Sequence, residues 1–205
     1  LFYFIFTKTE KNNHAIHKSS EIFVFFNGIL FNKKNLAQEY KIYNYTSESE
    51  LILELYLLNG ADLAKHLDGF FCFIIFDPKS KTIFAANDHI GSENVYIYNS
   101  TNHSTLSSDI KTLRTTHKLN EINPKRLETF FEFIHPESNE TFFENILQLN
   151  AFEMLELKKN NAKIEPYSSF NASKYDHLHS EEDFIKEYKR VFTESVANCM
   201  ETSQL

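Results

Sequence analysis

Asn27 and Gly28 form the first candidate site, because together they could bind an oxyanion. A side-chain amide and a glycine N–H are hydrogen-bond donors, and such donors stabilise the charge that develops on a carbonyl oxygen during acyl transfer. The pair stands in the apolar run EIFVFFNGILF. Asn-Gly between strand-forming residues is also typical of a type I′ hairpin turn. The local pattern favours the hairpin and leaves oxyanion binding as the alternative.

Two histidine pairs are candidate metal ligands. His14-x-x-His17 and His177-x-His179 each place two imidazoles close together, as in some zinc sites. Both pairs lie in polar segments that lack the further ligands of a zinc site. We therefore expect no metal site.

Asp88-His89 could form an acid–base pair, and Cys72 and Cys199 are the two cysteines of the chain. Both cysteines stand in apolar patterns, so we expect both thiols to be buried core groups. Their distance in sequence argues against a disulfide framework, which favours a reducing compartment and a cytoplasmic location.

Strand-forming segments rich in Phe, Ile and Val dominate the first half of the chain. Residues 1–7 and 21–26 are expected strands, and residues 67–77 are apolar on both faces, which is typical of a buried strand. Shorter strands are expected at TIFAAND, VYIYNS and TLSSDI. The segment AFEMLELKKNNAKIEPYSSF predicts a hairpin that turns at Asn160-Asn161.

The best helix signal lies in SESELILELYLLNG. Ser47 followed by Glu50 forms a capping box, and Gly60 is a typical helix end. Apolar residues cover nearly the whole circumference of this helix, so we expect it to be packed on all sides.

Two further helices are expected in the second half. Asn123 and Pro124 suit the first positions of a helix whose apolar face ends near Ile134. After a polar stretch, Ser180 is a predicted N-cap for a last helix with an apolar stripe. The stripe consists of Phe184, Tyr188, Val191, Phe192, Ser195 and Cys199.

The composition predicts a globular protein. The 205 residues are 42% hydrophobic and include 21 Phe and 10 Tyr, enough for one domain with a large aromatic core. The net charge of −7 argues against nucleic acid as a partner. Since no apolar run reaches about 18 residues, we also expect no membrane span.

Several segments resemble one known family. FNGILFNKKNLAQEY resembles the F-N-G-x-I-Y-N-x-x-x-L segment of the glutamine amidotransferase domain that opens asparagine synthetases. SESELILELYLLNGADLAKHLDGFFCFIIFD is similar to its S-D-T-E helix and L-x-G-x-F-A-F strand. FAANDHIGSENVYIY resembles its A-R-D-x-x-G-x-x-P-L-Y-Y segment, and LSSDIKTL resembles F-A-S-E-I-K-A-L. The resemblance runs in order from about residue 25 to residue 170.

The resemblance implies a fold and a domain order. The fold would be α+β, a four-layer αββα sandwich of the N-terminal-nucleophile hydrolase type, over residues 1–170. Residues 171–180 would be a linker, and residues 181–205 would begin an ATP-dependent synthetase domain. In the family the pyrophosphate loop of that domain follows this helix, so ATP and Mg would bind only beyond Leu205, and none would bind to this segment.

The departures from the family pattern concern glutamine hydrolysis. In active members an N-terminal Cys attacks glutamine, the Asn-Gly pair stabilises the oxyanion, and an Arg and an Asp hold the substrate. Here residue 1 is Leu, and Glu48 replaces that Asp. Only 26 residues precede Asn27, where the family has a longer segment that carries the substrate-holding Arg. Asn87 replaces another Arg, that of the A-R-D loop. We expect no catalytic residues, only a vestigial glutaminase pocket of Asn27, Gly28 and Glu48.

We therefore expect part of an asparagine-synthetase-like, ATP-dependent amide-forming ligase whose glutaminase has lapsed. Lasso-peptide cyclases and β-lactam synthetases, which also lack the Cys, are the members it resembles in this respect. Expected partners are the synthetase domain and a precursor peptide or small acyl substrate, and homodimerisation is left open. The alternatives are a working asparagine synthetase or sugar amidotransferase with its nucleophile outside this chain, and a non-catalytic peptide- or partner-binding module.

Overall fold

A computed structural model gives the arrangement of the chain. The structure describes only the backbone of residues 2–5, 14–16 and 201–202. For the other described residues it describes the side chains as well. The described ranges are 2–5, 14–16, 21–100, 103–134, 139–158, 161–169 and 171–202.

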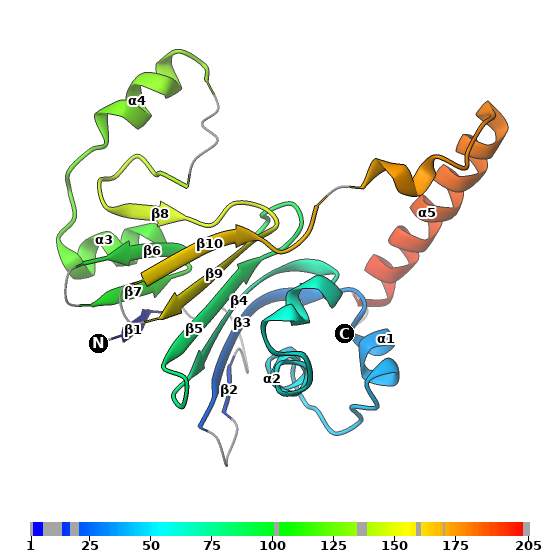
Figure 1. Cartoon of the computed structure of the whole chain (residues 1–205), viewed down its shortest axis with the longest axis horizontal. Coiled ribbons are helices and arrows are strands. Elements are labelled where there is room, and N and C mark those ends of the chain that lie inside the picture. The colour runs from blue at the N-terminus through cyan, green and yellow to red at the C-terminus, as the bar shows by residue number, and fades with distance from the viewer. Residues whose placement is uncertain are drawn as a thin grey trace.

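The described residues form two β-sheets, shown in Figure 1. The smaller sheet has the strand order β1-β7-β6-β8, in which β1 and β7 are parallel. The larger sheet has the order β10-β9-β5-β4-β3-β2 and is antiparallel throughout. The strands are β1 Phe2–Ile5, β2 His14–Ile16, β3 Phe23–Leu30, β4 Gly69–Asp77, β5 Thr82–Asn87, β6 Tyr96–Asn99, β7 Ser104–Ser107, β8 Ile146–Gln148, β9 Glu153–Lys158 and β10 Asn161–Pro166.

Helices cover the two outer faces of these sheets. Helix α2 contacts β3, whereas α3 contacts β6 and β7 on the smaller sheet. The helices are α1 Lys33–Glu39, α2 Glu48–Asn59, α3 Ile110–His117, α4 Pro124–Phe131 and α5 Glu181–Thr202, with 3₁₀ helices η1 Gly60–His66 and η2 Ala172–Tyr175.

Strand alternation divides the larger sheet into two buried faces, because successive side chains point to opposite sides of a strand. On β4, Phe71 and Phe73 belong to a core shared with α1, α2 and η1, whereas Cys72 and Ile74 face the smaller sheet. The core between the sheets is completed by residues of both, including Ile83, Leu155, Ile97 and Leu106. The four-layer αββα sandwich expected from the resemblance is therefore confirmed.

Helix α2 is fixed at both ends and packed along one side. Ser47 is its N-cap and accepts a hydrogen bond from the Glu50 N–H at 3.3 Å, and Gly60 follows its last residue with φ 59°. The residues Leu51, Ile52, Leu53 and Leu55 are buried, but Leu58 is 60% exposed. The expected caps are confirmed, whereas the expectation of packing on all sides is wrong, because Leu57 and Leu58 are exposed.

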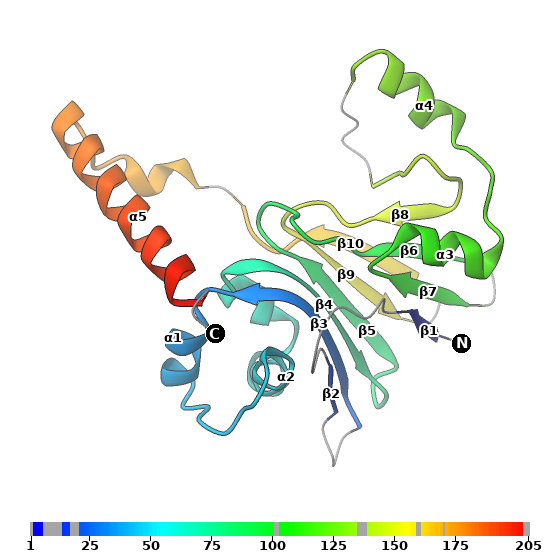
Figure 2. The same ribbon diagram turned by 180° about the vertical axis from the view of Figure 1, so that it is seen from behind.

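Helices α4 and α5 extend away from the two sheets, as both views show (Figure 1 and Figure 2). Asn123 caps α4 and Pro124 opens it as expected. The predicted apolar face of α4 is exposed, with Phe130 at 55% and Phe131 at 69%. Ser180 accepts a hydrogen bond from the Asp183 N–H at the start of α5, as expected of its cap.

Three local predictions need correction. Asn27-Gly28 is not a hairpin turn, because β3 continues through both residues and pairs with β4 from Phe23 to Leu30. Cys199 is exposed on α5 rather than in a core, whereas Cys72 is buried as expected. The β9–β10 hairpin is present, but Asn161 already pairs with Lys158, and residue 160 lies outside the described residues. None of the described helices combines the length and the apolar character needed to cross a membrane.

Candidate functional site

Asn27 lies at the end of a polar row that crosses three strands of the larger sheet. Its Cα pairs with that of Cys72 on β4, and Cys72 pairs in turn with Asn87 on β5. Paired residues share a face of the sheet, so all three lie on the side of the smaller sheet. Among the described strands, β2 pairs only with the start of β3, so Asn27 and Gly28 lie at the sheet edge.

Gly28 is required by the close approach of β3 to β4. Its φ is 126°, and a Cβ at this position would lie 2.0 Å from the backbone oxygen of Phe70. Gly69 on β4 is restricted in the same way by β3, since a Cβ on Gly69 would lie 2.1 Å from the backbone oxygen of Ile29. No side chain fits at either position without moving the backbone. The glycine of the Asn-Gly pair therefore has a structural reason that is independent of chemistry.

The Asn27 amide contacts a carboxylate. Its Nδ2 donates a hydrogen bond to Oε2 of Glu93 at 2.6 Å, in a partly buried position. Glu93 lies in the loop between β5 and β6, 66 residues away in sequence. A hydrogen bond to an ionised acceptor is about twice as strong as a neutral one. The candidate oxyanion donor is thus bound to a carboxylate of the chain itself, and no local sequence pattern indicates this pairing.

Asp88 holds the loop that carries Glu93. The Asp88 carboxylate accepts hydrogen bonds from the N–H groups of Phe71 and Ile90, at 3.0 and 2.9 Å, and from the N–H and hydroxyl of Ser92. Burial alone would raise the pKa of Asp88, but these hydrogen bonds outweigh it and lower the pKa. Its carboxylate is committed to the loop rather than to proton transfer.

His89 has a packing role beside Asp88. Its ring meets those of Phe152 and Tyr167 edge-on, with centroids 5.0 and 5.8 Å apart. The Tyr167 hydroxyl donates to the backbone oxygen of Asn87 at 2.6 Å. The geometry does not support an acid–base pair of Asp88 and His89, a candidate that the sequence only raised; the two residues lie in a loop after β5.

Cys72 and Asn87 are buried in the polar row. Burial, with Glu93 and Asp88 nearby, raises the pKa of the Cys72 thiol to about 12. A thiol that stays protonated at neutral pH is a poor nucleophile. The Asn87 amide donates to the Leu149 oxygen at 2.8 Å, which ties β5 to the strand-connecting segment after β8. Both residues therefore serve packing and position.

Glu48 begins α2 and forms an ion pair with Lys33, the first residue of α1. The Lys33 Nζ lies 2.9 Å from Glu48 Oε1, and the two side chains are 14% and 31% exposed. The carboxylate that replaces the family's Asp is therefore already bound to an ammonium group.

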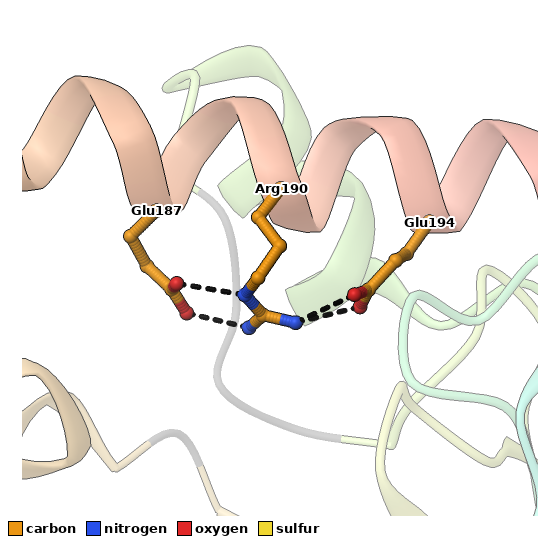
Figure 3. A network of polar contacts seen from close by, with 3 residues as sticks. All are labelled: Glu187, Arg190 and Glu194. Carbon is orange, nitrogen blue, oxygen red and sulfur yellow. Dashed lines mark hydrogen bonds and ion pairs between the residues drawn. The ribbon is translucent and has the colours of Figure 1, made fainter.

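The three arginines of the chain make ring contacts or ion pairs away from Asn27. Arg114 lies over the ring of Phe143 at 3.7 Å, and Arg126 lies over that of Phe142 at 4.9 Å. Arg190 on α5 binds the carboxylates of Glu187 and Glu194 (Figure 3). None of these three contacts involves the residues around Asn27.

The histidine pairs do not build a metal centre in the described part of the chain. His177 and His179 are exposed, and His14 is described only as backbone, while residue 17 lies outside the described residues. Within those residues, no group of three or more His, Cys, Asp or Glu side chains could hold a metal ion.

Comparisons with known proteins fit this geometry. Residues 7–168 match the glutamine amidotransferase domain family. The chain belongs to this family. A putative glutamine-hydrolysing asparagine synthetase of Methanocaldococcus jannaschii is 26% identical over 181 residues, covering 86% of this chain and 35% of that protein. Asparagine synthetase 3 of Arabidopsis thaliana is 32% identical over 91 residues, covering 43% of this chain and 16% of that protein.

A solved structure agrees with the fold. Glutamine phosphoribosylpyrophosphate amidotransferase of B. subtilis superposes with a TM-score of 0.54 at 16% identity, covering 75% of this chain and 30% of that chain. The amidotransferase domain of this chain is thus of the asparagine synthetase superfamily. The chain spans about a third or less of the length of these relatives.

Proposed function

We propose that this chain is the amidotransferase-like part of an ATP-dependent, amide-forming ligase of the asparagine synthetase type, in which glutamine hydrolysis has lapsed. The amine for the new amide bond would then come from the acceptor substrate rather than from glutamine. Macrolactam formation, as in lasso-peptide cyclases, is the version of this chemistry that we favour.

The hydrogen bond from Asn27 to Glu93 carries the proposal. In a working site this amide must be free to meet the oxyanion of a substrate. Here it lies 2.6 Å from a carboxylate oxygen, which would repel a developing negative charge on any substrate bound beside it. The same arrangement would weaken glutamine hydrolysis even if a nucleophile were supplied.

The substrate-binding groups support the same conclusion. Glu48 is paired with Lys33, and the three arginines of the chain contact Phe143, Phe142, Glu187 and Glu194. We infer that the glutaminase pocket expected from the resemblance, Asn27, Gly28 and Glu48, is vestigial, because the polar side chains of Asn27 and Glu48 already contact other side chains of the chain.

The remaining parts of the ligase belong to the proposal. ATP and Mg would bind to a synthetase domain, with α5 as its first helix and residues 171–180 as the linker. A precursor peptide or a small acyl compound would be the substrate, and the protein would work in the cytoplasm.

Glutamine hydrolysis tests the proposal directly. The full-length protein that contains this chain is incubated with L-glutamine, and released ammonia is measured beside a glutamine-hydrolysing asparagine synthetase as a positive control. A second sample is treated with a diazoketone analogue of glutamine, which alkylates the nucleophile of working glutaminases, and its intact mass is recorded. We expect ammonia at the background rate and no mass increase.

Glutamine-dependent ammonia release at a rate near that of the positive control would overturn the proposal, and so would stoichiometric alkylation. Peptide mapping of an alkylated sample would then identify the nucleophile. ATP consumption that depends on added glutamine would favour the alternative of a working glutamine-dependent synthetase.

A further inference from the structure

We propose that Tyr98, His103 and His117 form an acid-sensitive latch, which holds the last turn of α3 on β6 and β7 while both imidazoles are neutral and releases it when they are protonated. The latch belongs to the smaller sheet and shares no residue with the site around Asn27. The inference therefore goes beyond the proposed function, and it holds whether or not glutamine is hydrolysed.

Three aromatic rings from separate parts of the chain meet in the latch. The ring centroid of His117 lies 4.7 Å from that of Tyr98 and 5.1 Å from that of His103. The rings of Tyr98 and His103 are 5.9 Å apart. Tyr98 belongs to β6, His103 directly precedes β7, and His117 is the last residue of α3. Since α3 packs on both strands (Figure 1), the rings join the end of this helix to the sheet.

His103 is fixed from the side of the sheet. Its Nδ1 lies 3.0 Å from the Ser100 hydroxyl, and its backbone N–H donates to the same hydroxyl at 3.2 Å. The Ser100 N–H donates to the backbone oxygen of His103 at 2.9 Å, which links the end of β6 to the start of β7. His117 therefore packs on a ring that is already held in place.

His117 lacks a hydrogen bond that a buried polar group normally makes. Its Nε2 is buried and has no hydrogen-bond partner among the described residues. A phenylalanine could make the same ring contacts without burying an unpaired nitrogen. Stability at neutral pH therefore does not explain a histidine at this position.

Protonation would add a second N–H and a positive charge at this place. Burial, and then the His103 imidazole, hold the pKa of His117 below its usual value. The dipole of α3 and the Tyr98 ring favour a cation there. The other charged groups are Arg114, one turn earlier on α3, and Lys118, the next residue. None of these groups is a carboxylate that could pair with the imidazolium.

The lowered pKa gives the contact a definite pH dependence. The docked helix binds fewer protons than the released helix, in which His117 has its ordinary pKa. The latch is therefore fully stable above the ordinary pKa of histidine. It loses stability as the pH falls through that value toward the lowered pKa.

Release of this turn would act on α4. The residues after His117 are tied back to α3, because the Leu119 N–H donates to the Arg114 oxygen and the Arg114 Nε donates to the Leu119 oxygen. Helix α4 begins soon afterwards at Pro124 and extends away from the sheets (Figure 2). Acid should therefore loosen the attachment of α4 before the rest of the domain unfolds.

Hydrogen exchange in the full-length protein tests the latch. His117→Phe keeps an aromatic ring but cannot be protonated, and His179→Phe is the matched control at an exposed histidine. The wild type and both variants are compared at about pH 7.5 and about pH 5.5, on either side of the ordinary histidine pKa. Protection over residues 110–123 is corrected for the intrinsic effect of pH on exchange.

We expect a several-fold loss of protection over residues 110–123 at the lower pH in the wild type and in His179→Phe, and no such loss in His117→Phe. Equal losses in all three proteins would overturn the inference. A loss of the same size over α2 in the wild type would also overturn it, since that result indicates general acid unfolding.

A second measurement covers the case in which His117→Phe does not fold. The ring signals of His117 and His179 are followed by NMR while the wild type is titrated with acid. We expect His117 to titrate at a lower pH than His179, and the amide signals of residues 110–123 to change together with His117. Joint titration of the two histidines, or amide signals that do not follow His117, would refute the latch.

Discussion

Helices α2 and α5 are both rich in apolar residues, yet their surroundings are opposite. On α2, Leu51 and Leu55 are fully buried against β3 and its neighbours. On α5, Phe184 and Phe192 are 52% and 57% exposed, and the helix extends away from the sheets (Figure 2). The two helices have similar serine caps. The local sequence therefore sets where each helix begins. Whether its apolar face is buried depends on which other elements pack against that face.

Alanine substitutions at two glycines with positive φ should show the largest difference in lost stability between a packed and an open region. We expect Gly28→Ala to cost more than about 4 kcal/mol and to prevent stable folding, because its Cβ would overlap the Phe70 oxygen. Gly60→Ala should cost less, about 1–3 kcal/mol, since no non-neighbouring atom lies within 4 Å of its Cβ and only its backbone conformation, φ 59° and ψ −141°, opposes the change. Denaturant unfolding of the two variants measures the contrast. Equal losses would mean that backbone conformation, not the approach of β4, requires Gly28.

The second-largest difference in lost stability should separate a buried side chain on α2 from an exposed side chain on α5. We expect Leu55→Ala on α2 to lower the free energy of unfolding by about 2–5 kcal/mol, because it leaves a cavity in the core. Phe192→Ala on α5 should change it by less than about 0.5 kcal/mol, since its ring is exposed. Urea titrations of both variants check this. A large loss at Phe192 would show that α5 is packed in solution.

The smallest effect concerns the two helix caps. Ser47→Ala should lower global stability by about 1 kcal/mol, because α2 is part of the core and Ser47 accepts from the Glu50 N–H. Ser180→Ala removes the same kind of cap from α5, where only local fraying should follow. Amide hydrogen exchange separates the two outcomes. A global loss of protection in Ser180→Ala would contradict the independence of α5.

The sequence was sufficient for the secondary structure that local rules control. Ser47, Gly60 and Asn123 mark helix ends by side-chain or backbone chemistry within a few residues, and all three were predicted. The buried strand 67–77 was also recognised, since residues that are apolar on both faces predict a central strand. These signals need no knowledge of distant parts of the chain.

The role of a residue could not be predicted from the sequence where that role depends on a contact with a residue far away along the chain. The local pattern at Gly28 predicts a turn, but the neighbour that requires glycine is β4, more than 40 residues later. The contact between Glu93 and Asn27 has no local signal, because the two residues are 66 positions apart. The Lys33–Glu48 pair could have been suspected from opposite charges at the starts of successive helices, although that pattern alone is weak.

The reciprocal fit of Gly28 and Gly69 has an evolutionary consequence. Each glycine is opposed by a backbone atom of the other strand, so no side-chain change elsewhere can relieve a substitution at either position. Both glycines should therefore persist in descendants of this chain whether or not glutamine is ever hydrolysed. An Asn-Gly match alone would then overcount working glutaminases in a genome, and the residue that faces the asparagine amide would be the better character to score.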